Sequence, residues 1–292
     1  MSIFTGNATA MITPFNDKGI DFDAFEKHIE FQIANNTSAL VIAGTTGEPA
    51  TMTDDEKKSL LKFSIKQVKK RVPIIFGTGC NDTAKTINNS KTAEDLGADA
   101  VLLVTPYYNK TSQAGLIKHF ESIADAISIP AITYNVPVRT GLNISPETLK
   151  VISEHENIVA HKEAGGSIYQ LMDMVSLCSE NIDIYSGDDL MTFPLLACGG
   201  IGAISVISNI CPTETAALVS SYMSGDVAKS RQIQYTLNPL IKQLFIQVNP
   251  IPVKCAMNMM GMNAGKVRMP LVDLDEKDKA SLKKTLEDMN LL

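Results

Sequence analysis

The sequence predicts an α/β protein built on a (β/α)8 barrel, the TIM-barrel architecture, with a C-terminal helical extension. Between residues 8 and 206, eight short strand-like runs alternate with helical segments. Strands that alternate with helices form a parallel sheet, and eight such units are the number that forms a barrel. The length of 292 residues suits this fold, since α/β barrels often exceed the roughly 100–200 residues of an ordinary domain.

The strand-like runs follow one another at intervals of roughly 20–35 residues, which is the length of a strand, a helix and two turns. The predicted strands are Ala8–Ile12, Ala39–Ala43, Ile74–Gly77, Ala100–Val104, Ala131–Asn135, Ile158–Lys162, Ile182–Ser186 and Ala203–Val206. The predicted helices between them are Asp21–Asn36, Thr53–Lys70, Asp82–Leu96, Ser112–Ile127, Pro146–Glu154, Ser167–Ser179 and Leu190–Ala197.

Helix-end signals support these boundaries. Thr53 precedes Glu56 by three residues, which is the capping-box pattern, and Pro146 follows Ser145 at a first helical position. Gly97 supplies a C-terminal cap before the next strand. The chain after about residue 212 has helical patterning without a strand signal. We therefore expect a barrel domain over residues 1–225 and a helical region over residues 226–292.

Composition argues against several classes of protein. The chain has 26 basic and 32 acidic residues, a net charge of −6, so a basic nucleic-acid-binding face is not expected. No apolar run approaches the roughly 18–20 residues that span a bilayer. The N-terminus lacks a basic segment followed by an apolar one. We expect no nucleic-acid partner, no membrane association and a cytoplasmic location.

Cysteine and histidine patterns predict neither disulfides nor a metal centre. The five cysteines are widely spaced without a CxxC pair, which suggests free thiols. The four histidines include no HxxxH pair, so a zinc site is not expected. No GxxxxGK[ST] sequence and no strand–GxGxxG–helix unit is present, which argues against nucleotide-binding folds. No cofactor is expected.

Barrel enzymes place their chemistry at the C-terminal ends of the strands. Four such ends carry polar residues, and they are Gly44–Glu48, Pro106–Asn109, Tyr134–Gly141 and Lys162–Glu163. Lys162 ends an apolar run in which Ile158 and Ala160 alternate onto the same face. An ordinary lysine is only about 0.04% neutral at pH 7, and only the neutral amine attacks a carbonyl. Burial in the barrel would lower its pKa and make it a Schiff-base nucleophile. A structural ion pair with Glu163 is the alternative.

The other strand-end residues also allow two interpretations. Arg139, in a loop bounded by proline and glycine, could bind a substrate carboxylate or be a surface arginine. Tyr134 could transfer protons or be a core tyrosine. Thr45 and Thr46, between glycines, could form an anion-binding nest or a plain turn.

Five segments together resemble the dihydrodipicolinate synthase family in order and spacing over essentially the whole chain. They are Gly44–Glu48, Tyr134–Gly141, Lys162–Ala164, Ser186–Asp189 and Asn249–Lys254. The resemblance implies an enzyme that condenses pyruvate with L-aspartate 4-semialdehyde to 4-hydroxy-tetrahydrodipicolinate, a lyase-class reaction leading to diaminopimelate and lysine. It implies a homotetramer built as a dimer of dimers.

The resemblance also assigns roles to residues. Lys162 matches the Schiff-base lysine, Tyr134 the proton donor and acceptor, and Thr45 and Tyr108 its relay partners. In the family this second tyrosine reaches in from a neighbouring subunit. The residues that match substrate-binding or interface positions are Thr46 for the pyruvate carboxylate, Ile204 for a main-chain contact, Arg139 for the semialdehyde carboxylate, Gly187 in the Ser186–Asp189 motif, and Tyr107 at the interface.

One departure from the family pattern concerns regulation. Lysine-inhibited members line an interface pocket with histidines and a glutamate, and the matching positions here are Asp54, Lys57 and Lys85, although Asn81 and Tyr107 persist. A cation at Lys85 would repel the ammonium group of lysine. We expect weak or absent feedback inhibition by lysine.

Other functions are compatible with part of the pattern. N-acetylneuraminate lyase and keto-deoxy sugar-acid aldolases share the lysine, the tyrosine and a similar turn, whereas Arg139 and the doubled Tyr107–Tyr108 favour the synthase. A catalytically silent binding barrel would require loss of the lysine, tyrosine or threonine. A phosphate-binding isomerase barrel would require a clearer glycine-rich phosphate turn.

Overall fold

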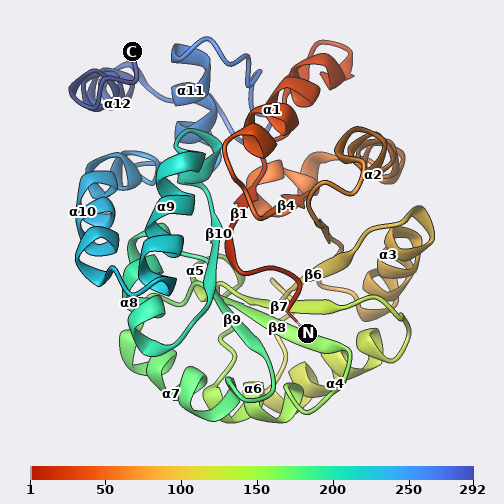
Figure 1. Cartoon of the computed structure of the whole chain (residues 1–292). Helices are drawn as coiled ribbons and strands as arrows, with labels where there is room; N and C mark the ends of the chain where they lie inside the picture. The colour runs from red at the N-terminus through yellow and green to blue at the C-terminus, as the bar shows by residue number, and fades with distance from the viewer. Residues whose placement is uncertain (1) are drawn as a thin grey trace.

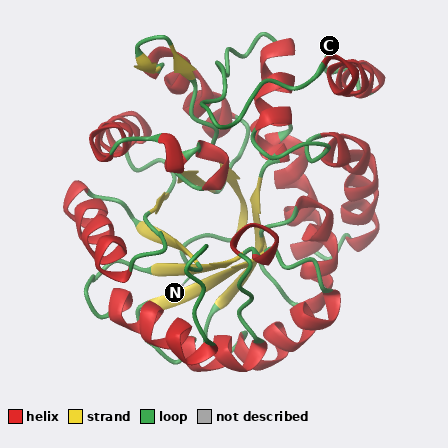
Figure 2. Ribbon diagram, turned by 180° about the vertical axis from the view of Figure 1, so that it is seen from behind, coloured by secondary structure: helices red, strands yellow, loops and turns green. Residues whose placement is uncertain are grey.

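A computed structural model describes residues 2–292 and confirms the (β/α)8 barrel. Residue 1, which the predicted barrel domain includes, lies outside the described residues. Eight parallel strands form a closed sheet in the order β1-β10-β9-β8-β7-β6-β5-β4 (Figure 1). Helices surround this ring of strands, as the view from behind also shows (Figure 2). The parallel strands are β1 (Gly6–Ala10), β4 (Ala39–Ile42), β5 (Ile74–Gly77), β6 (Ala100–Val104), β7 (Ala131–Asn135), β8 (Ile158–Glu163), β9 (Asp183–Ser186) and β10 (Gly202–Ser205).

The helices follow the predicted order. They are α1 (Phe22–Ala34), α2 (Asp54–Val68), α3 (Thr83–Leu96), α4 (Gln113–Ala124), α5 (Pro137–Thr140), α6 (Pro146–Ile152), α7 (Ile168–Cys178), α8 (Thr192–Cys198), α9 (Pro212–Met223), α10 (Val227–Gln243), α11 (Ile251–Met259) and α12 (Glu276–Asp288). The capping box of α2 is present, because the Thr53 hydroxyl accepts from the Glu56 amide and the Glu56 carboxylate accepts from the Thr53 amide. Gly97 ends α3 at a φ of 96°, which favours glycine.

Three local features differ from the predicted elements. The strand β1 begins two residues earlier than expected, because its ladder with β10 starts at Gly6 opposite Gly202. A small antiparallel pair, β2 (Phe15–Asn16) and β3 (Gly19–Ile20), was not predicted, since two-residue strands carry no periodic signal. The one-turn helix α5 lies within the loop, bounded by proline and glycine, that is predicted after the fifth strand.

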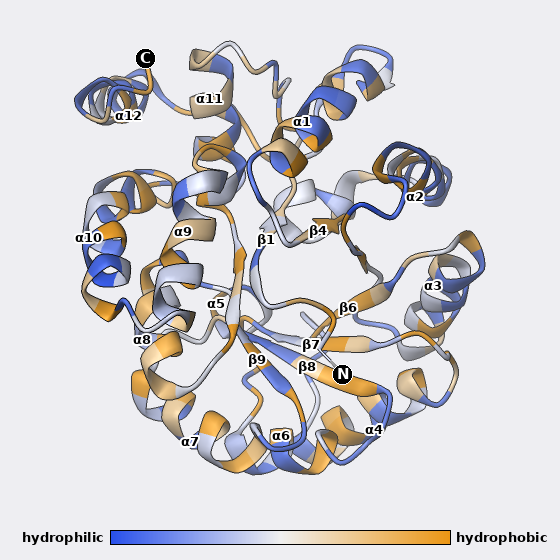
Figure 3. Ribbon diagram, in the orientation of Figure 1, coloured by the Kyte–Doolittle hydropathy of each residue, from blue (hydrophilic) through white to orange (hydrophobic). Residues whose placement is uncertain are grey.

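Small and branched side chains fill the barrel interior. Ala8, Val41, Leu102 and Ile204 belong to this inner cluster. At the end where the strands begin, Phe4 stacks on Tyr185 with ring centroids 4.2 Å apart. A second layer of apolar residues lies between strands and helices, and helices such as α2 and α10 carry both hydrophilic and hydrophobic residues (Figure 3). The interior is therefore packed up to the level at which the strand-end polar residues begin.

The C-terminal helices pack against the barrel rather than apart from it. Residues of α10, α11 and α12 share one hydrophobic cluster with Leu196 of α8 and Leu218 of α9. The predicted division at residue 225 falls between α9 and α10 and remains a prediction. None of the helices in residues 2–292 is both long enough and apolar enough to cross a membrane.

Candidate active site

Lys162 lies at the C-terminal end of β8 with only 5% of its surface exposed. Tyr134 is its register partner on the neighbouring strand β7, and the Lys162 ammonium nitrogen lies 4.3 Å from the centre of the tyrosine ring. Burial lowers the pKa of Lys162 to about 8, although the charge of Asp189 partly opposes the shift. A much larger share of neutral amine is thus present near pH 7 than an exposed lysine would have.

The sequence predicts that the side chains of Ile158, Ala160 and Lys162 share one face of β8, and the structure bears this out for the last two. Ala160 contacts the barrel interior and Lys162 points to the same side, but Ile158 packs in the layer between strands and helices. A register shift between β7 and β8 explains the difference, because Ala131 pairs with Ile158 whereas the next residue, Ile132, pairs with Ala160.

Glu163 is engaged elsewhere and is not the ion-pair partner of Lys162. Its carboxylate accepts hydrogen bonds from the Asn135 side chain at 3.0 and 3.2 Å and lies 3.0 Å from a ring nitrogen of His161. The other ring nitrogen of His161 lies 2.8 Å from the Thr133 hydroxyl. Within residues 2–292, no salt bridge involves Lys162. The network supports β7 and β8 and leaves the lysine without a carboxylate partner.

Gly187 and Asp189, which follow β9, shape the space around the lysine. A Cβ atom on Gly187 would lie 2.7 Å from Cε of Lys162, so a larger residue here would displace the lysine side chain. Asp189 is buried, and its carboxylate accepts hydrogen bonds from the amides of Val206 and Ile207 at 3.0 and 2.9 Å. Its charge favours the ammonium form of Lys162 without a direct ion pair.

Tyr134 is buried, and burial raises the pKa of its phenol, while the charge of Arg139 and the Thr45 side chain act in the opposite direction. The hydroxyl therefore remains protonated and able to donate at neutral pH. Thr45 and Thr46 lie in a 3-10 turn directly after β4. The Thr46 side chain is buried, and Thr45 is partly exposed. The structure thus brings Lys162, Tyr134 and Thr45 to one end of the barrel.

Asn249 connects two predicted substrate-binding residues, a link that the sequence did not reveal. Its side-chain nitrogen donates to the Thr46 hydroxyl at 3.0 Å, and its carbonyl oxygen accepts from the Arg139 guanidinium at 2.9 Å. The only sequence signal for a role of Asn249 is its place at the start of the Asn249–Lys254 segment, which carries the family resemblance. One residue between α10 and α11 therefore holds side chains that follow β4 and β7.

A buried ion pair between Lys254 and Glu48 lies at the end of the Thr45–Gly47 turn. Lys254 on α11 lies 2.8 Å from the Glu48 carboxylate, and each side chain is 2% exposed. The second Glu48 oxygen accepts from the Arg268 amide at 2.9 Å. Glu48 adopts a left-handed conformation with φ of 57° at the end of the Thr45–Gly47 turn. Lys254 is the last residue of the Asn249–Lys254 segment, and its partner was not predictable from spacing.

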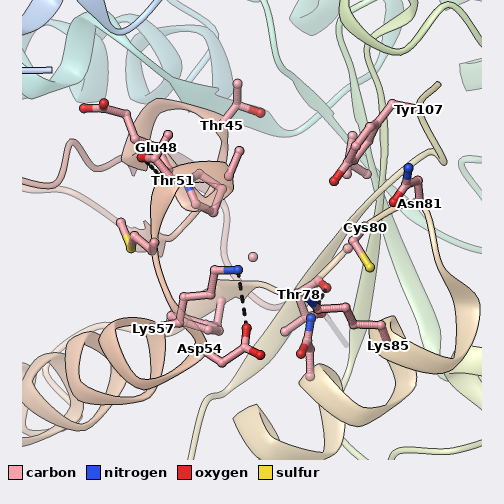
Figure 4. Close-up of a pocket in the computed structure, with 18 of the residues that line it drawn as sticks. Thr45, Glu48, Thr51, Asp54, Lys57, Thr78, Cys80, Asn81, Lys85 and Tyr107 are labelled. Carbon is pink, nitrogen blue, oxygen red and sulfur yellow. Dashed lines mark hydrogen bonds and ion pairs between the residues drawn. The ribbon is translucent and has the colours of Figure 1, made fainter. Parts of the chain in front are cut away.

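The remaining predicted residues are two tyrosines after β6 and one isoleucine in β10. Tyr108 is 93% exposed with a left-handed φ of 70°, and Tyr107 is 38% exposed. Ile204 is fully buried in β10, opposite Ala8. A cavity of about 800 Å³ opens beside the site and continues between α2 and α3. Its lining includes Thr45 and Tyr107, which Figure 4 shows. Arg139 also belongs to the lining, whereas Lys162 does not.

Known proteins resemble this chain in sequence and in fold. The sequence model of the Dihydrodipicolinate synthetase family matches residues 3–289. A protein from Acetivibrio thermocellus named 4-hydroxy-tetrahydrodipicolinate synthase is 52% identical over 290 residues, which are 99% of each chain. The crystal structure of dihydrodipicolinate synthase from Thermotoga maritima matches with a TM-score of 0.98 at 41% identity and covers 100% of both chains. The structure of DHDPS from Cyanidioschyzon merolae with lysine bound has a TM-score of 0.97 at 34% identity, again over 100% of both chains. The chain therefore belongs to the dihydrodipicolinate synthetase family.

Proposed function

We propose that the protein condenses pyruvate with L-aspartate 4-semialdehyde through a Schiff base on Lys162, giving 4-hydroxy-tetrahydrodipicolinate for diaminopimelate and lysine biosynthesis. The observation that carries this proposal is a buried lysine with a lowered pKa and no carboxylate partner, facing a buried tyrosine, in a member of this family. The protein is a lyase-class enzyme, as its relatives are.

The reaction follows from the electronics of the imine. The neutral Lys162 amine attacks the keto carbon of pyruvate, and water leaves as the imine forms. The protonated imine withdraws electrons, so the pyruvate methyl group loses a proton and becomes an enamine carbon. This carbon attacks the aldehyde, the aldehyde oxygen becomes an alkoxide as the carbon–carbon bond forms, and Tyr134 donates the proton that converts this alkoxide to a hydroxyl. The amine of the semialdehyde then displaces Lys162 and completes the ring.

The carboxylates of the two substrates need separate positions. Thr46 is proposed to hold the pyruvate carboxylate by its hydroxyl and amide, with Ile204 providing a main-chain contact. Gly187 leaves room for the imine beside Lys162. Arg139, at the mouth of the site, is proposed to bind the semialdehyde carboxylate, for which a planar guanidinium is well suited.

The experiment that tests this function compares aldehyde acceptors. The purified enzyme is supplied with pyruvate and either aspartate semialdehyde or sugar acceptors such as N-acetylmannosamine, and the consumption of pyruvate is followed. The proposal predicts that pyruvate is consumed with aspartate semialdehyde and is not consumed with the sugar acceptors. Turnover only with the sugar acceptors would assign the chain to the lyase branch instead.

We propose that Tyr108 completes a proton relay with Thr45 and Tyr134 in a neighbouring subunit of a homotetramer. Its support is the nearly full exposure of an aromatic side chain and the match to the family position. Tyr108→Phe is expected to lose most activity without unfolding. The control is Tyr169→Phe, since Tyr169 is also exposed, and unchanged turnover in Tyr108→Phe would refute the relay.

Regulation and location are further parts of the proposal. Lysine inhibition is expected to be weak or absent, because Lys57 and Lys85 line the cavity where the family pattern places histidines and a glutamate. Half-loss of activity at low-millimolar lysine or below would contradict this. A cytoplasmic location is proposed, since all five cysteines are free thiols, as expected in a reducing compartment.

A further inference from the structure

The semialdehyde carries an ammonium group, and none of the residues assigned so far binds a cation. Arg139 is proposed to hold its carboxylate, and Lys162 is proposed to form the imine with pyruvate. The guanidinium and the protonated imine are both positively charged, so they repel an ammonium group placed between them. The amine must nevertheless come close to the imine carbon, because it closes the ring there. The site therefore needs an acidic side chain with a free oxygen.

Three acidic side chains at this end of the barrel are engaged within the protein. Glu48 is paired with Lys254. Glu163 is bonded to side chains of β7 and β8. Asp189 accepts hydrogen bonds from two backbone amides that follow β10. Each of these three carboxylates thus has a structural partner.

Asp188 is different, because one of its carboxylate oxygens has no partner within residues 2–292. The other oxygen accepts a hydrogen bond from the Leu190 amide at 3.0 Å, and no salt bridge in this part of the chain involves the side chain. Asp188 directly follows Gly187, where an added Cβ atom would lie 2.7 Å from Cε of Lys162. Asp188 therefore combines an unpaired carboxylate oxygen with a place next to the glycine that packs on the proposed nucleophile.

The charge of Asp188 also reaches the reacting groups. Burial is the main cause of the raised pKa of the Tyr134 phenol, and the negative charge of Asp188 adds to it, which places this carboxylate near the tyrosine that faces Lys162. Burial raises the pKa of Asp188 itself, and the Leu190 amide opposes the shift. A carboxylate with a raised pKa takes up a proton more readily than an ordinary aspartate. Because Asp188 is only partly buried, it can pass that proton to water.

We propose that Asp188 binds the ammonium group of the semialdehyde and accepts a proton from it before the ring closes, a role that rests on the proposed function. The freed amine forms a bond to the imine carbon, the bond from that carbon to the Lys162 nitrogen breaks, and Lys162 leaves as a neutral amine. One ammonium proton goes to Asp188 and a second to the leaving Lys162 nitrogen. The third is lost from the ring nitrogen, which becomes a neutral imine, and it replaces the proton that was taken up when the pyruvate imine formed. The proton on Asp188 passes to water and is the one proton that the overall reaction releases.

Asp188→Asn tests the proposal with two aldehydes that differ only in the amine. Succinate semialdehyde has the carboxylate and the aldehyde of aspartate semialdehyde but no ammonium group. Asparagine keeps an oxygen that can accept from the Leu190 amide, so the turn should persist. We expect pyruvate consumption with aspartate semialdehyde to fall at least about tenfold in kcat/KM, the loss typical of a hydrogen bond to a charged group.

Trapping on the enzyme separates ring closure from carbon–carbon bond formation. The pyruvate imine is mixed with each aldehyde, the reaction is stopped with borohydride, and the adducts on Lys162 are identified by mass. In Asp188→Asn the uncyclised adduct of aspartate semialdehyde should accumulate, whereas the succinate semialdehyde adduct should form as fast as in the wild type. An equal fall in rate with both aldehydes would overturn the proposal, as would an unchanged rate with aspartate semialdehyde.

The control variant is Asp183→Asn, since Asp183 begins β9 at the opposite end of the barrel. It should leave the rates with both aldehydes unchanged, and a loss equal to that of Asp188→Asn would show a general charge effect and overturn the proposal. The proposed function fails separately if the wild type forms the pyruvate imine but consumes no pyruvate with aspartate semialdehyde. A wild type that turns over and an Asp188→Asn variant that matches it would overturn the role of Asp188 alone.

Discussion

Two lysines are buried in this chain, and their surroundings differ. Lys254 donates to three oxygen atoms, Glu48 Oε1 at 2.8 Å and the carbonyls of Thr13 and Lys266 at 2.9 and 2.7 Å. Lys162 has no such acceptor among the described hydrogen bonds and lies over the ring of Tyr134. Burial lowers the pKa of both amines. Asp189 opposes the shift at Lys162 through its charge alone, whereas Glu48 opposes the shift at Lys254 through its charge and a direct hydrogen bond.

This difference separates a structural lysine, Lys254, from the proposed nucleophile, Lys162. Burial alone does not provide a reactive amine, because a full set of acceptors stabilises the ammonium form. Lys254 meets that condition and fixes the turn that carries Thr45 and Thr46. Lys162 lacks those acceptors, so its neutral form is accessible and its proton can be lost to water or substrate.

Lys162→Met is expected to have the largest effect. Without an amine no imine forms, so kcat/KM should fall by at least about a thousandfold, while the melting temperature stays close to that of the wild type. Steady-state kinetics and thermal unfolding measure the two effects. Lys254→Met is the matched variant, and it should retain imine formation wherever it is folded.

Lys254→Met is expected to act on stability. It leaves the Glu48 carboxylate buried and unpaired, which typically costs about 3–5 kcal/mol in the free energy of unfolding. Denaturant unfolding of this variant is compared with Lys279→Met, which removes an ion pair whose acidic partner, Glu276, is 90% exposed and should cost less than about 1 kcal/mol. A similar loss in both variants would contradict the structural role of Lys254.

Tyr134→Phe keeps the ring under the ammonium group but removes the hydroxyl. Because burial raises the pKa of this phenol, it is a proton donor at neutral pH, and its loss should lower kcat about a hundredfold. Tyr185→Phe also removes a hydroxyl from the barrel interior, where it donates to the Phe4 carbonyl. If both variants lose activity equally, Tyr134 has no specific catalytic role.

The pH profile reports the ionisation of Lys162. With a pKa of about 8, the amine is increasingly protonated as the pH falls below that value. The kcat/KM for pyruvate should therefore decrease about tenfold per pH unit below about 8 and level off above it. A flat profile between pH 6 and 9 would show that this amine does not act as the free-enzyme nucleophile.

Asn249→Ala should have the smallest effect. Alanine removes the side-chain hydrogen bond to Thr46. The backbone carbonyl at position 249 still accepts from Arg139, but it loses the anchoring that the bond to Thr46 gives it. The KM for each substrate should rise about fivefold, while imine trapping with pyruvate persists. Gln247→Ala, at an exposed position of the same loop, is the control. An unchanged KM for both substrates in Asn249→Ala would exclude a positioning role.

The fold was predictable because each strand and helix of the barrel has a recognisable local sequence pattern. Runs such as Ala100–Val104 and Ala131–Asn135 have the bounds in the structure that were read from the sequence. Caps such as Thr53 fix helix starts within a few residues. The hairpin of β2 and β3 was missed, because its pairing depends on a turn and not on a repeat.

The site was predictable where a residue acts through its place on a strand. Lys162 and Tyr134 meet because neighbouring parallel strands end at the same edge. The contacts of Asn249 and Lys254 were not predictable, since they join residues about 200 positions apart. Such contacts depend on how α11 packs on the barrel, and no local pattern encodes that arrangement.

Borohydride reduction in the presence of pyruvate, followed by peptide mass mapping, tests the distinction between the two buried lysines most directly. The account predicts one reduced pyruvyl adduct per chain, on Lys162, with Lys254 unmodified. Folded protein without an adduct on Lys162, or with the adduct on Lys254, would contradict the assignment of Lys162 as the Schiff-base nucleophile.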